Sequence, residues 1–288
     1  MKEASVEVSS KRSTIHDPRS TAPSAGVINI DKPADWTSHD VVAKIRSLLR
    51  RSGIERVGHT GTLDPMATGV LPICFGAATK LSSYFMNGDK EYAVTCRLGE
   101  ETDTGDRTGK VIHSCEPPVF SNQALADALS SFVGIISQTP PIYSAIKVSG
   151  VPMYKMARKG IDVERVPRSI TIKSIELERV DGHDLYLNVA CSKGTYIRTL
   201  CADIGRKLGV FGVVDALRRL RCGPFEIDQS IPLDKFIQLY TVGGWEARIV
   251  SLEEAVAMLP SVAEKDGINN DDMQVGVIEC QGGGAQKC

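Results

Sequence analysis

The sequence lacks several features that would place it outside the common globular classes. It contains no run of 18 or more apolar residues, so no membrane-spanning helix is predicted. Aromatic residues make up only 6% of the chain and the net charge is −1, so these totals do not indicate a nucleic-acid partner. The 42% hydrophobic and 24% charged residues are ordinary for a globular protein, and 288 residues suffice for one large domain with a small addition.

The eight cysteines also lack the spacing of known metal sites. No two of them stand in a C-x-x-C pattern, and no histidine accompanies them at zinc-ligand spacing. We therefore expect no structural metal and no disulfide framework. Residues 1–25 are rich in Ser, Thr, Lys, Arg and Pro and lack the apolar core of a secretory signal. This composition predicts a disordered N-terminal tail on a cytoplasmic protein.

Charge is distributed unevenly along the chain. Residues 231–288 carry 9 acidic and 4 basic side chains, a net charge of −5. Residues 1–230 carry 26 acidic and 30 basic side chains, a net charge of +4. A mildly basic body permits RNA binding without requiring it.

The most informative stretch is Gly58–Pro72, which reads GHTGTLDPMATGVLP. It places the single carboxylate of Asp64 among three glycines, and the following Pro65 biases Asp64 away from the helical region. The stretch runs directly into an apolar segment, so Asp64 is expected close to the interior. A carboxylate there needs a cationic or hydrogen-bonding partner. An active-site loop is one interpretation; a tight surface turn with a helix-capping Asp is the other.

Three segments around this loop have clear local patterns. A buried strand is predicted at Gly26–Asp31, and a helix after it, where Thr37 and Asp40 have capping-box spacing. Residues 91–98 alternate as in a half-buried strand, with Tyr92 either packed in the core or presented as a functional ring. Residues 79–86 predict a short helix.

A strand, a glycine and a helix meet near Arg198, in the segment CSKGTYIRTL. Such a junction suits an anion-binding group, and Arg198 is the candidate partner of Asp64; an ordinary surface arginine is the alternative. The acidic turn at residues 100–109 fits a polar hairpin better than a calcium loop, because the EF-hand spacing is absent.

Together these motifs resemble one family. The blocks GVINIDKPADWTSHDVV, GHTGTLDPMATGVLP, KEYAVTCRLGEETDTGD, PPIYSAIKVSGVPMY and CSKGTYIRTL–LRRL occur in this order over about residues 26–230. They are similar to the TruB family of tRNA pseudouridine synthases, and the GHTGTLDP block is the most specific of them.

The resemblance implies an enzyme that converts uridine 55 in the T-loop of tRNA into pseudouridine without a cofactor or metal. In the resemblance, Asp64 matches the nucleophile, Tyr92 the active-site tyrosine and Arg198 the arginine that pairs with the aspartate. The implied substrate-binding residues are His59, Leu217, Lys32 and Lys80. Attack on the sugar and attack on the base both use this nucleophile. Arg198 is expected to keep Asp64 ionised by lowering its pKa.

The resemblance also implies the architecture, an α+β fold in which a large mixed sheet with flanking helices carries a central cleft. We expect a tail at 1–25, a catalytic domain at 26–230 and a separate acidic appendage at 231–288, a reduced form of the small RNA-binding lobe (PUA type) that ends most members. Three basic segments are candidates for phosphate contacts: residues 44–51, 154–159 and 218–221.

Two other functions remain open on the sequence. One is a non-catalytic protein that binds and refolds tRNA through the same cleft, and the other is a different enzyme with an aspartate nucleophile, such as a phosphatase. The second lacks a D-x-D motif and a metal-binding cluster. We expect the protein to be a monomer.

Overall fold

A single mixed sheet organises the chain. The computed structural model describes residues 23–259 except 145, 149, 158 and 162, and eleven strands of this part form one sheet. The order is β14-β1-β3-β12-β4-β11-β10-β7, with β13 beside β12, β15 beside β1 and β2 beside β3. The strands of this sheet are β1 (Gly26–Lys32), β2 (Val57–His59), β3 (Thr68–Phe75), β4 (Lys90–Leu98), β7 (Gly134–Gln138), β10 (Arg168–Asp181), β11 (Asp184–Cys191), β12 (Gly212–Cys222), β13 (Phe225–Glu226), β14 (Ile231–Pro232) and β15 (Ile249–Ser251).

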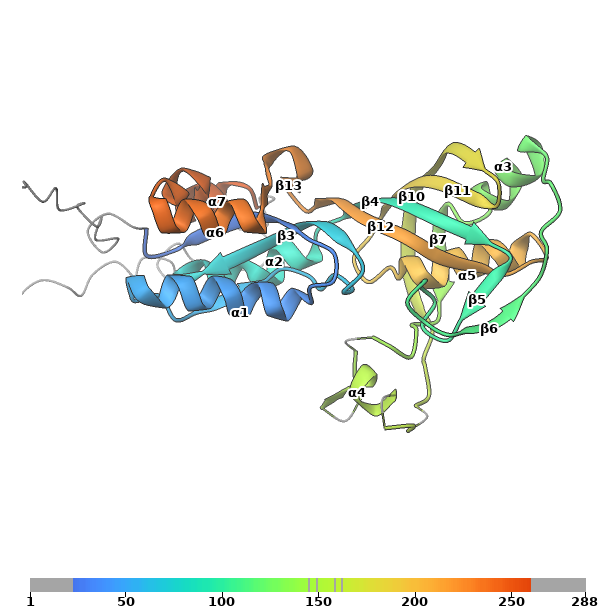
Figure 1. The fold of residues 1–288 in the computed structure, drawn as a ribbon, viewed down its shortest axis with the longest axis horizontal. Helices are drawn as coiled ribbons and strands as arrows, with labels where there is room; N and C mark the ends of the chain where they lie inside the picture. Colours follow the sequence, from blue (N-terminus) through green and yellow to red (C-terminus); the bar gives the residue numbers. More distant parts are fainter. Residues whose placement is uncertain (1–22, 145, 149, 158, 162, 260–288) are drawn as a thin grey trace, which may run out of the picture.

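Helices flank the sheet at both ends of an elongated molecule (Figure 1). They are α1 (Ser38–Leu49), α2 (Ser82–Asn87), α3 (Asn122–Ser130), α5 (Ile197–Lys207), α6 (Leu233–Val242) and α7 (Leu252–Ala257), with short 3₁₀ turns η1 (Arg50–Ser52), η2 (Gly76–Leu81), η3 (Ile227–Gln229) and η4 (Trp245–Arg248). Helix α4 (Met153–Ala157) lies instead on a segment between β7 and β10 that projects away from the sheet (Figure 1). Two hairpins stand apart from the sheet, β5 (Glu100–Thr102) with β6 (Val111–Ser114), and β8 (Lys147–Val148) with β9 (Val151–Pro152). The predicted α+β fold is confirmed.

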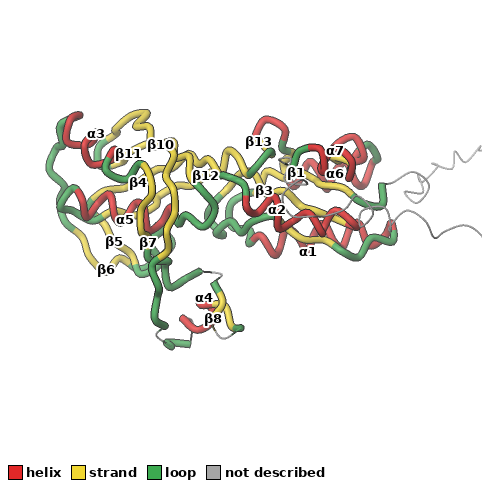
Figure 2. The backbone as a smooth tube through the Cα atoms, turned by 180° about the vertical axis from the view of Figure 1, so that it is seen from behind, coloured by secondary structure: helices red, strands yellow, loops and turns green. Residues whose placement is uncertain are grey.

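Strand β12 joins the two ends of the molecule (Figures 1 and 2). It pairs in parallel with the start of β3 and antiparallel with β4 along nearly its whole length. Helices α1 and α6 pack near β1 and β3, whereas α3 and α5 pack near β4 and β10 (Figure 2). The loop between β2 and β3 therefore lies where the two halves of the sheet meet.

Local sequence signals account for several of these elements. Thr37 and Asp40 form the predicted capping box at the start of α1, and the buried side chains of α1 fall on one face. In β4 the even-numbered residues are buried and the odd-numbered ones partly exposed, as the alternation predicts. The acidic turn at 100–109 forms the β5–β6 hairpin.

The C-terminal region differs from the expected separate appendage. Strand β14 pairs with Ile30 and Asp31, and β15 pairs with residues 26–28, so both lie along the outer edge of β1. Helix α6 adds Phe236 to the main core, and Trp245 packs against it. The edge of β1 has unpaired backbone groups that these strands satisfy, so residues 231–257 complete the sheet.

Other expectations lie wholly or partly outside the described residues. These are the disordered tail, of which the structure describes only residues 23–25, and the part of the acidic C-terminal region from residue 260. In the described part of the chain, no helix is long and apolar enough to cross a membrane.

Close contact between β3 and β12 depends on Gly69. It adopts φ +101°, and a Cβ atom there would lie 2.2 Å from the Arg219 carbonyl oxygen. We expect Gly69→Ala to lower the free energy of unfolding by about 3–5 kcal/mol, from steric overlap and backbone strain together.

Denaturant unfolding measures this effect, with Gly182→Ala as the matched control. Gly182 also has positive φ, but nothing lies within 4 Å of its added Cβ. Its substitution is expected to cost only about 1–2 kcal/mol. Equal losses for the two variants would contradict the role assigned to Gly69.

Candidate active site

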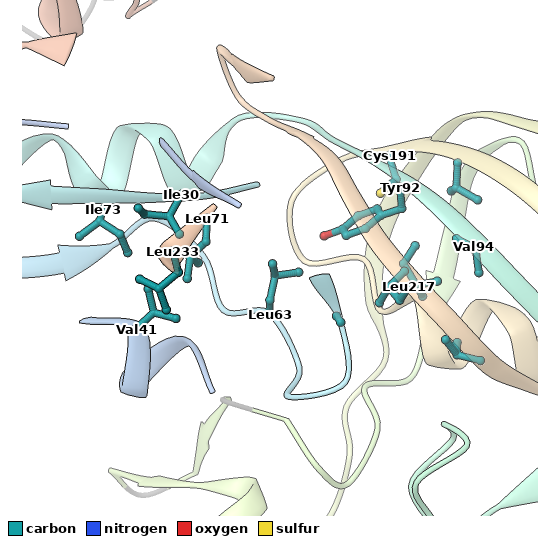
Figure 3. Packing of buried hydrophobic residues seen from close by; sticks show 14 of the residues in the cluster. Ile30, Val41, Leu63, Leu71, Ile73, Tyr92, Val94, Cys191, Leu217 and Leu233 are labelled. Carbon is teal, nitrogen blue, oxygen red and sulfur yellow. The ribbon is translucent and has the colours of Figure 1, made fainter. Parts of the chain in front are cut away.

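The loop that carries Asp64 is held against the start of α1. The Ser38 hydroxyl accepts a hydrogen bond from the Leu63 amide (2.8 Å) and is 3.0 Å from the Leu63 carbonyl oxygen, to which it donates. The Leu63 side chain is buried in the core between β3 and the Tyr92 region (Figure 3). These contacts fix the backbone directly before Asp64, so its carboxyl group is held in place.

Lys32 fixes the backbone after Asp64. Its side chain is fully buried, and its ammonium donates to the carbonyl oxygens of Pro65 (3.0 Å), Pro33 (2.8 Å) and Trp36 (2.6 Å). Burial lowers the pKa of Lys32 to about 8, against the opposing charges of Asp35 and Asp64. Lys32 lies close to the site, as predicted, and its three donors are used on the protein's own backbone.

Arg198 pairs with Asp64, as the sequence predicted. The guanidinium lies 2.9 Å (Nε to Oδ2) and 3.2 Å (Nη2 to Oδ1) from the carboxylate, a two-point contact. It also donates to the carbonyl oxygens of Thr104 (2.9 Å) and Tyr143 (2.8 Å). The first turn of α5 thus connects the Asp64 loop, the β5–β6 hairpin and the segment after β7.

The hairpin contributes one residue that the sequence reading missed. Asp106 is buried and accepts hydrogen bonds from the Thr104 hydroxyl and the Thr108 amide, both at 3.0 Å. This holds the Thr104 carbonyl toward Arg198. The sequence signal for Asp106 was the cluster of carboxylates at residues 100–109, but such a cluster is also typical of a solvent-exposed hairpin.

The pKa of Asp64 differs in direction from the expectation. Burial raises it above its ordinary value, and the carboxylate of Asp106 raises it further. The charges of Arg198 and Lys32 act in the opposite direction but do not outweigh burial. The sequence indicated both the cation and a position near the interior, but not that desolvation would outweigh the cation, because that balance depends on packing around the loop.

Tyr92 lies on β4 beside the apolar wall of the site. Its ring is buried near Leu217 of β12, with the hydroxyl directed to the side where Leu63 lies (Figure 3). Burial raises the Tyr92 pKa to about 12, so the phenol is neutral at pH 7. A ring packed in the core and a functional ring were the two interpretations of Tyr92. They are compatible, because the ring is buried while its hydroxyl points toward the side where Leu63 and the Asp64 loop lie (Figure 3).

His59 ends β2, just before the loop. Its Nδ1 accepts a hydrogen bond from the Gly61 amide (3.2 Å), and its ring meets the His39 ring edge-on at 6.0 Å. Burial lowers the pKa of His59 to about 4. The neutral ring therefore carries its proton on Nε2, which is a donor for a ligand.

Lys80 is not brought to this site. It is exposed on η2, which follows β3, whereas Asp64 precedes β3. An eight-residue strand spans about 26 Å, and it separates the two residues.

The arginine run at 218–221 also differs from the expected phosphate-contact surface. Arg218 pairs with Asp31 (2.7 Å) and Arg221 with Glu91 (2.9 Å from Nε). Arg219 is 1% exposed. All three lie on β12, where successive residues face opposite sides, so the run is not one basic surface.

The described residues hold no group of three or more His, Cys, Asp and Glu side chains that fits a metal ion. A cleft beside Arg198 is lined by the hairpin, α5 and residues 137–143. The arrangement is thus a half-buried carboxylate fixed by an arginine, on a loop that begins just after a neutral histidine and is tied by Arg219 to the strand that also carries Leu217. Such a group can act as a nucleophile held in place.

Comparisons with known proteins identify the family of the chain. The structure matches the protein of a crystal structure described as a Cbf5-Nop10-Gar1 complex, with TM-score 0.63 and 31% identity over 82% of this chain and 62% of that one. Residues 48–197 match the model for the N-terminal domain of TruB family pseudouridylate synthases. Residues 198–257 match the model for the tRNA pseudouridylate synthase B C-terminal domain.

Similar curated proteins carry the name of the same family. The chain is 48% identical to tRNA pseudouridine synthase B of Pseudomonas syringae pv. syringae over 77% of this chain and 72% of that protein. It is 47% identical to the protein of that name from Psychrobacter cryohalolentis, but spans only 59% of its length. The chain belongs to the TruB family of pseudouridylate synthases, which are isomerases.

Proposed function

We propose that the protein isomerises uridine 55 in the T-loop of tRNA to pseudouridine, with Asp64 as the nucleophile. The observation that carries this proposal is the two-point ion pair of Asp64 and Arg198 at the meeting point of three segments. The family membership supplies the class of reaction.

The reaction moves the glycosidic bond of uridine from N1 to C5 and releases the C5 proton. A carboxylate can form a covalent intermediate while the base turns, and Arg198 holds it in the attacking orientation. Every oxidation state is unchanged and no phosphoryl group is transferred, so the proposal includes no cofactor or metal.

The remaining side chains fit the binding of a base that has left its stack. Extrusion of uridine costs a few kcal/mol, and packing on Tyr92 and Leu217 offsets part of it. The Nε2 proton of His59 can donate to the RNA. We place Asp64, Tyr92 and Arg198 in the catalytic group and His59, Leu217 and Lys32 in substrate binding or support.

The position of the modified uridine is tested with two tRNA transcripts containing [5-³H]uridine, one unchanged and one with cytidine at position 55. The wild-type protein should release tritium from the first and none from the second, without added metal or nucleotide. Equal release from both transcripts would place the modified uridine elsewhere.

The pKa of Asp64 predicts the acid side of the pH–rate profile. Catalysis needs the carboxylate, whose ionised fraction falls as the pH drops through the pKa of the folded protein. Because burial raises that pKa, the apparent pKa of the acid limb of kcat/KM should lie above the ordinary Asp value of 3.8. An acid limb at or below 3.8 would contradict this account.

Three further expectations belong to the proposal: a monomeric state, a place in the cytoplasm, and an RNA-binding role for part of the C-terminal region. Gel filtration with light scattering tests the first of them directly.

A further inference from the structure

Arg219 is a buried cation with no assigned role in the proposed reaction. Its side chain is 1% exposed. Nε donates to the Val70 carbonyl oxygen of β3 (2.7 Å), and Nη2 donates to the Gly61 carbonyl oxygen of the Asp64 loop (3.1 Å). It therefore ties β12 both to β3 and to the loop of the site.

Arg219 also reaches Tyr92. The two residues are direct partners in the antiparallel pairing of β12 with β4, which places the guanidinium beside the Tyr92 hydroxyl, where it can donate a hydrogen bond to it. A guanidinium only donates, so the phenol oxygen accepts this bond. The hydroxyl proton of Tyr92 is then directed away from Arg219.

Ion pairing does not explain a cation at this position. None of the ion pairs among the described residues includes Arg219, whereas its neighbours Arg218 and Arg221 pair with Asp31 and Glu91. Its acceptors are two carbonyl oxygens and a phenol. An apolar side chain of similar volume commonly stabilises a core better than a buried charge.

The charge of Arg219 acts on the groups around it. It opposes the effect of burial on Tyr92, whose pKa would otherwise rise further. It also helps to lower the pKa values of His59 and Lys32. One side chain thus influences three residues on separate elements of the site.

We propose that Arg219 is a positioning residue for the isomerisation, which holds the Tyr92 hydroxyl and the Gly61 carbonyl in one arrangement and directs the Tyr92 proton toward the uridine. This rests on the proposed function. Tyr92 touches the substrate in this proposal, and Arg219 acts through it and through the loop.

Single-turnover tritium release with excess protein tests the rate effect. Arg219→Lys keeps a charge but loses the planar fork, and should lower the rate constant at least about tenfold. Dissociation of tRNA should change less than about threefold, because the residue is buried away from RNA. Arg218→Lys is the matched control on the same strand and should keep the wild-type rate.

A double-mutant cycle tests the route of action. In a Tyr92→Phe background the hydroxyl is absent and only the contact with the Gly61 carbonyl remains to be lost, so Arg219→Lys should cost less than about threefold more. A loss as large as in the wild-type background would overturn the proposal, as would an unchanged rate in the single variant.

A measurement without RNA separates this proposal from the proposed function. The ¹³Cζ tyrosine signal of Tyr92, assigned by its absence in Tyr92→Phe, should shift in Arg219→Lys and stay in place in Arg218→Lys. An unmoved signal in a folded Arg219→Lys protein overturns the positioning role. If the wild type releases no tritium, the proposed function fails, whatever the signal does.

Discussion

Asp64→Asn protein is expected to bind tRNA but to form no pseudouridine. Loss of the nucleophile should lower the single-turnover rate at least about 10⁴-fold. Asn has the same shape, and its amide oxygen can still accept from Arg198, so the loop should keep its position. Tritium release measures the rate and filter retention measures binding, which should stay within about threefold of wild type.

The matched control for this variant is Asp103→Asn. Asp103 lies in the same hairpin that faces Arg198, where its carboxylate accepts from the Lys110 amide. The control should retain the wild-type rate. Substantial release by Asp64→Asn would contradict the role of Asp64. Wild-type protein that binds and refolds tRNA without any release would favour the non-catalytic alternative.

Arg198→Met is expected to have the second largest effect. The variant leaves the Asp64 carboxylate without its cation and removes the donors to Thr104 and Tyr143. Because the Asp64 side chain is 32% exposed, we expect a moderate loss of about 2 kcal/mol in the free energy of unfolding. The rate should fall about 10³-fold from lost orientation of the carboxylate.

A pH profile separates charge from packing in this variant. Arg198 lowers the Asp64 pKa against burial, so its removal should move the acid limb of the residual activity to higher pH. Arg206→Met is the control, because Arg206 lies in the last turn of α5 and pairs with Asp203 at the surface. An unmoved acid limb in Arg198→Met would contradict the electrostatic role of Arg198.

Several parts of the fold followed from local signals in the sequence. The capping box predicted the start of α1, and strict alternation predicted which face of β4 is buried. The pairing of Asp64 with Arg198, 134 residues apart, followed from the need of a near-buried carboxylate for a cation and from the family motifs.

What the sequence did not show depends on distant contacts. The pairing of β14 with β1 joins residues about 200 positions apart, and a two-residue strand has no periodicity of its own. In the sequence Arg219 belongs to a basic run. It stands two residues after the buried Leu217, however, so both side chains face the inner side of β12. The sequence placed Asp64 near the interior, but whether burial or Arg198 has the larger effect on its pKa depends on the packing around the loop.

The most direct test of the account is the time course of tritium release from tRNA containing [5-³H]uridine with wild-type protein, without metal, nucleotide or other cofactor. The account predicts that release stops at one tritium per tRNA, because one uridine loses its C5 hydrogen. No release from a tRNA that the protein binds would contradict isomerisation.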